Sequence, residues 1–451
     1  MFSRSIFTIL DEWAGKKNRK PLVLRGARQV GKTTAVNLWA EHFDNYLYYN
    51  LDLPEERKLF ESNLEFDKLI ESIYFQKNVA RDQGTTLLFI DEIQNSPRTV
   101  ELLRYFYEKS RDLYVIAAGS LLESLIDRHI SFPVGRVEYM RIRPLSFTEY
   151  LNAAGEERAL AELANIPVND YAHDRLMALF NRYALIGGMP EVVRIWLERG
   201  DLTYLKQVYE DLIIAYMDDV EKYASNRNQA QVIRHIIRNA FYHASSRITF
   251  QGFGKSNFRS REMSEAFTIL EQAMLLHLIY PTTSLKVPAI PDRRKSPRLQ
   301  ILDSGLVTYF AGLQGDLINA INIDGMFRGK IAEHIVGQEM LSTNPSPLHK
   351  LHFWVREKKQ STAEIDFVLP HTQGLVPVEV KSGSVGRLRS LHQFMDQADH
   401  PFAVRLFGHQ LKIDSVKTLS GKPFHLLNLP FYLAGKLDVY LEWFIERVKN
   451  F

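Results

Sequence analysis

Residues that can do phosphate chemistry gather first in the stretch "GARQVGKTT", which matches the pattern G-x-x-x-x-G-K-[ST]. In this pattern the glycines let backbone N–H groups wrap phosphates, the lysine reaches their outer oxygens, and the hydroxyl holds Mg²⁺. An apolar run precedes the stretch and a helical pattern follows it, so a helix N-terminus faces the phosphates. The stretch predicts a nucleoside triphosphate site, with Lys32 on the phosphates and Thr33 on the metal. Its members are Gly26, Ala27, Arg28, Gln29, Val30, Gly31, Lys32, Thr33 and Thr34.

Two adjacent acids end the apolar run "LLFIDEIQ". Asp91 is expected in the Mg²⁺ shell, and Glu92 is expected to activate the attacking water. A buried strand that stops at a solvated turn explains one acid but hardly two. Ser120, after the next apolar run, is predicted to sense the γ-phosphate. Arg136 is predicted to stabilise transition-state charge, in its own chain or from a neighbouring subunit; the alternative is a surface arginine.

A second constellation lies in "EIDFVLPHTQGLVPVEVKSG", residues 364–383. Alternate residues of a strand share a face, so two paired strands bring Asp366, Glu379 and Lys381 to one surface. The carboxylates of Asp366 and Glu379 are expected to bind a divalent ion that polarises a phosphodiester. Lys381 would orient the water or neutralise charge. Glu364 shares the face of Asp366 and could substitute as a ligand; the alternative, which is favoured, is an exposed side chain. The alternative is a polar strand face without chemistry.

The elements that must position these residues follow from the hydrophobic pattern. Between residues 21 and 142, short continuous apolar runs alternate with helical patterns, which predicts parallel strands covered by helices on both faces. Helical patterns follow, and then two helices and a Pro-rich basic excursion predict a winged helix-turn-helix. The last part returns to mixed α/β and ends in two apolar helical patterns.

Several motifs together resemble one family of proteins. "LRGARQVGKTT", "LLFIDEIQ", "AAGSLLESL", "GRVEYMRIRPLSFTEYL" and "GGMPEVV" are similar to AAA-type ATPases of bacteria and archaea related to the STAND class. "RLQILDSGLVTYFAGL" and "LPFYLAGKL" resemble later landmarks of that family. In that family a winged helix and a domain similar to restriction endonucleases, with the signature D…[DE]-x-K, follow the ATPase. Such nuclease folds usually add an acid from an upstream helix, so the resemblance implies Glu333 of "GKIAEHIVGQEM" as a further metal ligand. The resemblance implies ATP rather than GTP as the nucleotide.

Pattern and resemblance together predict an α/β chain in four parts. These are an ATPase core with a P-loop and a parallel sheet (1–151), a helical lid or linker (152–237), a winged-helix-like domain (238–313) and a restriction-endonuclease-like α/β domain (314–451). Nuclease-like domains also serve as structural or protein-binding modules, so cleavage by the last part stays open.

Basic residues lie where a wing and its approach would be. Arg293, Arg294, Lys295 and Arg298 fall in "KVPAIPDRRKSPR", and such a patch can neutralise DNA phosphates. The alternative is an ordinary solvated loop. On the approach to the expected recognition helix lie Arg247, Lys255, Arg259 and Arg261.

Composition limits the function classes. The net charge of +3 is too small to imply nucleic-acid binding by itself. The chain has no cysteine, which excludes a disulfide framework, a thiolate metal site and a cysteine nucleophile. No run of about 18 apolar residues is present, so no membrane span is expected, and the N-terminus lacks a signal-peptide pattern. A cytoplasmic location is expected.

The leading hypothesis is an Mg²⁺-dependent ATPase that gates DNA binding or cleavage by its later domains. The alternative is a nucleotide-switched signalling or scaffold protein, whose last domain recognises a protein partner or a second copy of the chain.

Overall fold

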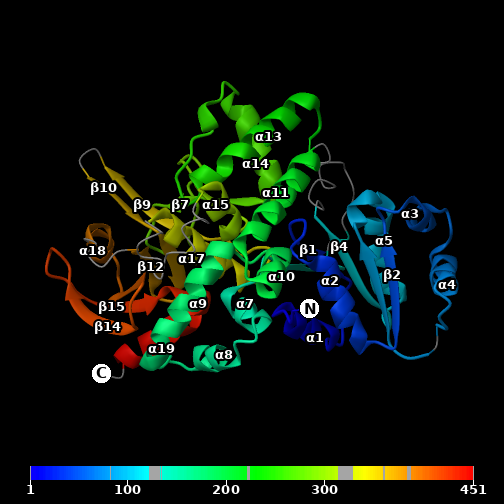
Figure 1. Cartoon of the computed structure of the whole chain (residues 1–451), viewed down its shortest axis with the longest axis horizontal. Helices are drawn as coiled ribbons and strands as arrows, with labels where there is room; N and C mark the ends of the chain where they lie inside the picture. Colours follow the sequence, from blue (N-terminus) through cyan, green and yellow to red (C-terminus); the bar gives the residue numbers. More distant parts are fainter. Residues whose placement is uncertain are drawn as a thin grey trace.

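The computed structural model describes residues 2–81, 83–120, 133, 135–220, 224–312, 329–358, 361–382 and 388–449. Figure 1 shows the N-terminal sheet on one side, helices in the centre and the C-terminal strands on the other side. The expected boundary between residues 313 and 314 lies outside the described residues. Among the described helices, none combines the length and the apolar character that crossing a membrane requires.

The five strands expected between residues 21 and 142 form one parallel sheet, in the order β2-β3-β4-β1-β5. Because all five run the same way, the residues that follow β1, β3 and β4 meet at one edge of the sheet. This prediction is confirmed. The strands are β1 Leu22–Arg25, β2 Asn45–Asn50, β3 Thr86–Asp91, β4 Tyr114–Gly119 and β5 Glu138–Arg141.

Both faces of this sheet are buried. Leu22 and Leu24 of β1 belong to one hydrophobic cluster, and Val23 belongs to another. The continuous apolar runs of the strands follow from burial on both sides. Helices α1 (Ile6–Ala14) and α2 (Lys32–Trp39) cover the first face, while α3 (Pro54–Glu61), α4 (Phe66–Gln76) and α5 (Pro97–Lys109) cover the second.

Helices alone follow the sheet, as expected. The first, α7, begins with a capping box: Ser146 Oγ accepts from the Glu149 N–H, and the Glu149 carboxylate accepts from the Ser146 N–H. The helices are α7 Phe147–Ala153, α8 Glu157–Ala164, α9 His173–Ile186, α10 Pro190–Arg199 and α11 Leu202–Asp218.

The next part pairs two helices with a two-stranded sheet. Its first helix, α13, starts at Arg227, earlier than the expected boundary at residue 238, because Asn226 caps it by accepting from the Gln229 N–H. Strands β6 and β8 pair antiparallel. The excursion between them adds β7 (Pro281–Thr282) beside β9 of the C-terminal part. The other elements are α14 Ser260–Gln272, β6 Leu276–Ile279, β8 Arg298–Ile301 and α15 Ser304–Phe310.

The C-terminal part holds two sheets, in the orders β10-β9-β7 and β11-β12-β13-β15-β14. The run "AEIDFVL", expected as one strand, breaks at Asp366 into β10 and β11 of different sheets. The helices α17 Lys330–Ser342, α18 Arg389–Met395 and α19 Leu437–Lys449 complete this part. Its strands are β9 Phe353–Lys358, β10 Ser361–Ile365, β11 Phe367–His371, β12 Gly374–Val380, β13 Phe402–Phe407, β14 Lys412–Lys417 and β15 Pro423–Pro430.

The two helical patterns expected at the end of the chain are only partly right. Strands β14 and β15 follow β13, and a 3₁₀ helix, η7 (Phe431–Lys436), and α19 come after them. Strand β15 lies between β13 and β14, so it is buried and reads as a continuous apolar run. Periodicity alone does not distinguish such a run from a buried helix.

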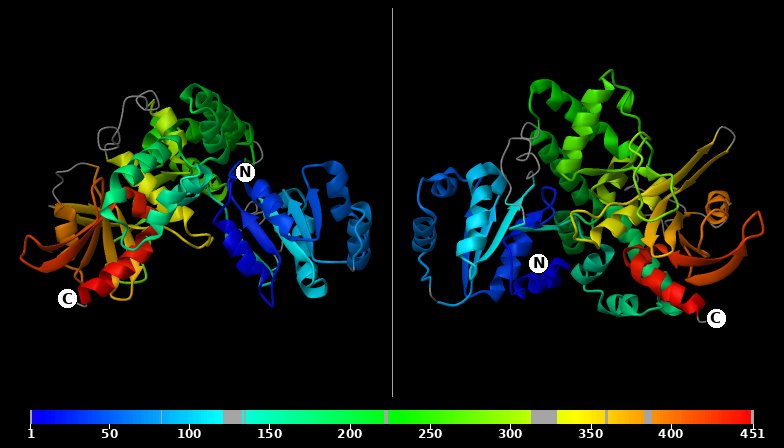
Figure 2. Two further views of the ribbon diagram at one scale, coloured as in Figure 1. Left: turned by 60° about the horizontal axis from the view of Figure 1, so that its bottom comes forward. Right: turned by 180° about the vertical axis from the view of Figure 1, so that it is seen from behind.

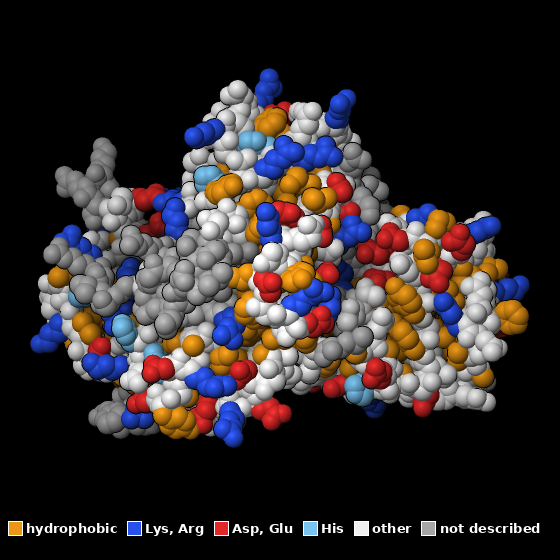
Figure 3. Space-filling model, viewed as in Figure 1, with side chains coloured by type: hydrophobic (Ala, Val, Ile, Leu, Met, Phe, Trp, Pro, Cys, Tyr) orange, Lys and Arg blue, Asp and Glu red, His pale blue; other side chains and the backbone are white. Residues whose placement is uncertain are grey.

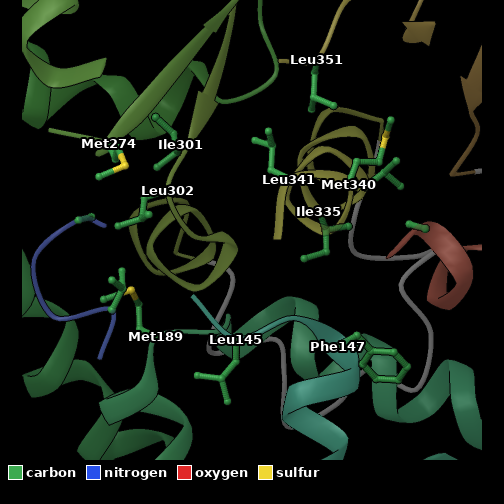
Figure 4. Close-up of a cluster of buried hydrophobic side chains, with 14 of the residues drawn as sticks. Leu145, Phe147, Met189, Met274, Ile301, Leu302, Ile335, Met340, Leu341 and Leu351 are labelled. Atoms are coloured by element: carbon green, nitrogen blue, oxygen red, sulfur yellow. The ribbon is translucent and has the colours of Figure 1, made fainter. Parts of the chain in front are cut away.

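The parts share one hydrophobic core. Figure 4 shows Leu145 and Phe147 in one apolar cluster with Leu302, which lies between β8 and α15, and with Ile335 and Leu341 of α17. The views in Figure 2 show the central helices lying against the strands of the C-terminal part. Because this core is continuous, the helical region and the C-terminal part are expected to unfold together.

Gly188 lies where the segment around Leu145 packs against the segment around Asp303. The Leu145 N–H donates to the Gly188 carbonyl (2.7 Å), and the Gly188 N–H donates to Asp303 Oδ2 (2.6 Å). A Cβ atom on Gly188 would lie 2.1 Å from the Leu145 carbonyl oxygen. No side chain fits here without moving the backbone.

Gly188→Ala is therefore expected to lower the free energy of unfolding by about 1–3 kcal/mol or more, because the clash is with backbone. Gly15→Ala is the matched control, since a Cβ there would meet Asp11 O at an ordinary 3.5 Å. Denaturant midpoints of both variants give the measurement. Equal midpoints for Gly188→Ala and the wild type would contradict the tight junction.

Candidate functional site

The phosphate-binding loop connects β1 to α2 at the edge where the parallel strands end. Gly31 precedes α2 with φ +90°, a conformation that favours glycine. Gly26 packs so closely on the end of β5 that a Cβ atom would lie 2.7 Å from the Ile142 carbonyl oxygen. Both glycines of the motif are thus required by the backbone path.

Lys32 lies inside this loop and is almost fully buried. Its ammonium donates to the carbonyl oxygens of Gly26 and Ala27, both at 2.9 Å. Burial lowers the pKa of Lys32, while the charges of Glu92 and Asp91 oppose that shift. A phosphate group would replace the two carbonyls with stronger acceptors.

The predicted metal-side residues come together next to Lys32. Thr33 Oγ1 donates to Asp91 Oδ2 at 2.5 Å, so two oxygens that suit Mg²⁺ are adjacent. Glu92 follows in a left-handed conformation with φ 52°, and Gln94 Nε2 donates to its carboxylate. Burial raises the pKa of both Asp91 and Glu92. Thr33 and Asp91 are the residues that would hold Mg²⁺, and the ion would supply positive charge against the phosphates.

A cavity of about 660 Å³ opens over this loop. Lys32, Thr33, Thr34 and Glu92 line one side, and residues of α10 line the other, so the volume suits a nucleotide. Arg194 of α10 lines the cavity and pairs with Glu198 at 2.9 Å. Sequence analysis missed Arg194, although "GGMPEVV" stood out directly before it.

The loop is also tied to distant elements. Tyr216 of α11 donates to the Arg28 carbonyl (3.2 Å), and the Arg28 guanidinium pairs with Asp219. Arg4, 8% exposed, donates to the Val30 carbonyl at 3.2 Å. A movement of the loop on nucleotide binding would therefore change its contacts with α11 and with the N-terminal segment.

The two further predicted residues fall in different places. Ser120 is buried directly after β4, at the same edge as the loop. Arg136 precedes β5 and pairs with Glu108 at 2.6 Å. The loop follows β1 and Arg136 precedes the parallel strand β5, so they lie at opposite edges of the sheet. A role for Arg136 within its own chain is wrong in this structure; a role in a neighbouring subunit stays a prediction.

The acidic residues of the C-terminal part converge around an arginine. The Arg298 side chain of β8 is 8% exposed, and its guanidinium reaches Glu333 Oε2 (3.3 Å), Asp366 Oδ1 (3.1 Å) and the Glu364 carboxylate. Burial disfavours its charge, yet Glu333, Asp366 and Glu364 together raise the pKa of Arg298. Sequence analysis placed Arg298 in a DNA-binding wing, and that placement is wrong because the side chain is buried among carboxylates.

Glu379 and Lys381 complete this cluster on the expected shared face. Lys381 Nζ pairs with Glu379 Oε1 at 2.5 Å, while Glu379 Oε2 is buried without a hydrogen-bond partner among the described residues. Asp366 Oδ2 accepts from the Val380 N–H at 2.8 Å. Burial, followed by the charge of Asp366, raises the pKa of Glu333 and Glu379.

The carboxylates predicted to bind a metal are therefore not arranged as a metal site in this structure. Within the described ranges, no three His, Asp or Glu side chains are arranged to hold a metal ion. The guanidinium of Arg298 supplies the positive charge among Glu333, Glu364 and Asp366 that a divalent ion would otherwise bring.

The other basic residues of the excursion are also engaged. Lys295 pairs with Glu357, and Arg294 pairs with Asp292 at 3.1 Å. Arg293 lies over the Tyr280 ring, 5.7 Å from its centroid. The expected basic wing is thus largely neutralised, and its strand β7 is paired with β9.

Comparisons with protein families agree with the geometry of the first site. A model described as an AAA domain matches residues 18–151. Two models described as domains of unknown function (DUF8612 and DUF4143) match residues 177–317 and 328–419. A search of curated proteins finds no match to the chain. The match supports a P-loop domain of the ATPase type in residues 18–151.

Among solved structures, the chain is similar to a Walker-type ATPase of Pyrococcus abyssi, paby2304. The identity is 13%, the TM-score is 0.45, and the match covers 69% of this chain and 96% of that one. It is also similar to the ORC1 protein of Aeropyrum pernix in complex with DNA, with 13% identity, a TM-score of 0.30 and coverage of 69% and 90%. A third is the RuvB branch-migration motor of Thermotoga maritima, with 16% identity, a TM-score of 0.27 and coverage of 65% and 93%.

Removal of the central guanidinium should expose the acidic cluster. Arg298→Ala is expected to lower the free energy of unfolding by about 3–5 kcal/mol, because buried carboxylates lose their counter-charge. Mg²⁺ or Mn²⁺ should restore part of this loss by entering among the carboxylates. Thermal unfolding with and without each ion measures both effects.

Arg294→Ala is the control, since its side chain is 91% exposed, and it should change stability by less than about 0.5 kcal/mol. If Arg298→Ala is as stable as the wild type, the cluster does not depend on Arg298. If the ions stabilise Arg298→Ala no more than the wild type, the carboxylates cannot gather around a metal.

Proposed function

We propose that this protein is an Mg²⁺-dependent ATPase whose nucleotide cycle changes the arrangement of its helical and C-terminal parts. The observation that carries the proposal is the convergence of Lys32, Thr33 and Glu92 on one cavity at the edge of the parallel sheet, with Asp91 hydrogen-bonded to Thr33. Lys32 would hold the phosphates, Thr33 and Asp91 would hold the ion, and Glu92 would accept a proton from the attacking water.

The contacts of the loop support a link between the nucleotide and the later parts. Arg28 and Val30 of the loop are bonded to α11 and to Arg4. Arg4 also pairs with Glu149 of α7, and the adjacent Phe147 N–H donates to Glu339 of α17 at 3.0 Å. A chain of buried polar contacts thus runs from the loop to the C-terminal part.

Glu92→Gln is expected to lower the ATPase kcat by about 10²–10⁴-fold, because the amide cannot accept the proton of the attacking water. Its affinity for ATP should stay within a few-fold of the wild type. Lys32→Ala should instead lose ATP binding, because the phosphates lose their buried cation. Phosphate release and nucleotide titrations separate the two effects.

Lys17→Ala, at an exposed lysine of the same part, is the control and should match the wild type. If Lys32→Ala binds ATP as the wild type does, the proposal that this loop binds the phosphates is wrong.

A second candidate function is metal-dependent cleavage of DNA by the C-terminal part. Its support is the convergence of Glu333, Asp366, Glu379 and Lys381 on one surface. In this proposal the nucleotide cycle withdraws Arg298 and a divalent ion takes its place. Lys381 would then neutralise charge at the phosphodiester.

DNA would approach through the part that resembles a winged helix, formed by α13, α14 and the β6/β8 pair. Figure 3 shows lysine and arginine side chains over the upper helices of the visible face. Because the expected wing is neutralised, the exposed residues of this helical face are the better candidates for phosphate contacts. They are Arg227, Arg238, Lys255, Arg259 and Arg261.

If this second function holds, the wild type with Mg²⁺ or Mn²⁺ should cut a panel of single-stranded, duplex and branched DNA only when ATP is present. Asp366→Ala should bind DNA but cut nothing, because the metal loses a ligand, and Lys32→Ala should cut nothing because ATP no longer acts. Gel assays of cutting and salt-dependent binding give the readout.

Wild type that binds ATP, cuts nothing and matches Asp366→Ala would eliminate the cleavage proposal. The nucleotide-switched scaffold, with a protein partner or a second copy of the chain, would then take its place.

A further inference from the structure

The run "LLFIDEIQ" ends in Gln94, a residue that neither proposed function uses. Gln94 lies in the short 3₁₀ helix η2 (Ile93–Asn95), which begins directly after Glu92. The described residues that line the nucleotide cavity include Glu92 but not Gln94. An effect of Gln94 on the reaction would therefore have to pass through Glu92.

The backbone of Glu92 is fixed on both sides. Its φ of 52° and ψ of 42° lie in the left-handed region, which residues other than glycine rarely adopt. The Glu92 N–H donates to Asp91 Oδ1 at 3.0 Å, and the Glu92 carbonyl accepts from the Asn95 N–H at 3.0 Å. Ile93, the next residue, is fully buried in the hydrophobic cluster on the second face of the sheet. These contacts fix where the Glu92 side chain starts, but several side-chain torsions still separate that point from the carboxylate.

Gln94 holds the carboxylate itself. Its Nε2 donates to Glu92 Oε2. The reversed amide would place its oxygen against the carboxylate, so the nitrogen must face Glu92. The described residues give Glu92 Oε1 no hydrogen-bond donor, and this oxygen is therefore available to a molecule in the cavity.

The other end of the Gln94 amide argues against a purely structural role. Gln94 Oε1 is buried and has no hydrogen-bond partner among the described residues. A buried acceptor without a partner costs about 1–3 kcal/mol, and such groups are rare in folded proteins. An apolar side chain of the same length would avoid this cost. The contact with Glu92 is thus what accounts for an amide at this position.

We propose that Gln94 is a positioning residue of the ATPase site, which holds Glu92 Oε2 so that Glu92 Oε1 accepts the proton of the attacking water. This inference rests on the proposed ATPase function. As the water oxygen bonds to the γ-phosphorus, the bond from phosphorus to the bridging oxygen breaks, ADP leaves, and the water proton passes to Glu92 Oε1. Without Gln94 the carboxylate would turn away from the water, and a displacement of about 1 Å can cost about 10²-fold in rate.

Gln94→Met removes the donor and keeps the length of the side chain. It is expected to lower the ATPase kcat by about 10–100-fold and to leave KM for ATP within a few-fold, because Gln94 does not line the nucleotide cavity. Gln76→Met, at an exposed glutamine of α4, is the matched control and should equal the wild type. Phosphate release at varied ATP concentration measures both constants. A kcat equal to that of the wild type overturns the inference.

A double variant tests whether Gln94 acts through Glu92. Adding Gln94→Met to Glu92→Gln should lower kcat by less than about twofold, since residues that act as a unit are not additive and no carboxylate is left to position. A further loss of about tenfold or more would give Gln94 a separate role and overturn the inference.

The melting temperature separates a positioning residue from a structural one. Gln94→Met should melt at the temperature of the wild type or above it, because a buried acceptor without a partner is removed. A lower melting temperature together with an additive loss of kcat would identify a structural glutamine and overturn the inference. If Gln94→Met fails to fold, Gln94→Asn decides: its amide is one methylene too short to reach Glu92, so the same loss of kcat is expected, and full activity overturns the inference.

The same measurements distinguish this inference from the proposed function. An active wild type and a Glu92→Gln variant with little activity support the ATPase, and full activity of Gln94→Met beside them overturns the role of Gln94 alone. A wild type that hydrolyses no ATP, or a Glu92→Gln variant with full activity, overturns the proposed function and this inference with it.

Discussion

A buried ion pair between Arg4 and Glu149 holds the nucleotide loop against the rest of the chain. Arg4 donates to Glu149, to the Val30 carbonyl of the loop and to the Arg143 carbonyl (2.6 Å). Glu149 in turn closes the capping box of α7. Breaking one partner of such a pair would leave the other charge buried and unpaired. The positions of the loop, the N-terminal segment and α7 therefore depend on each other.

The two sites predicted from the sequence are in different electrostatic states. At the loop, the Lys32 ammonium donates to the neutral carbonyls of Gly26 and Ala27 and forms no ion pair with Asp91 or Glu92, so its charge is available to a phosphate. In the C-terminal part, Arg298 already satisfies the carboxylates around it. A phosphate at the first site would have to replace only the carbonyl partners of Lys32, whereas an ion at the second would require Arg298 of β8 to leave the carboxylates.

A site could be predicted from the sequence where its residues lie close together along the chain. The loop is contiguous, and the acids at Asp91 follow an apolar run, so both could be found from pattern alone. The sequence order also indicates that Arg136 lies far from the loop. Arg136 precedes its strand, whereas the loop follows its own, and the two strands are parallel. Arg298 approaches Asp366 across 68 residues, and Arg4 approaches Glu149 across 145, so neither contact has a local signature. Tertiary packing decides such pairs.

The pairing of β7 with β9 has a consequence for how this protein can be divided. Strand β9 lies between β10 and β7, and β7 belongs to the preceding part of the chain. A fragment that starts after residue 313 would lose both β7 and Arg298. It would present an unpaired strand edge, which favours intermolecular association, next to carboxylates without a counter-charge. Such a fragment should aggregate, so the C-terminal part is best expressed together with β7 and β8.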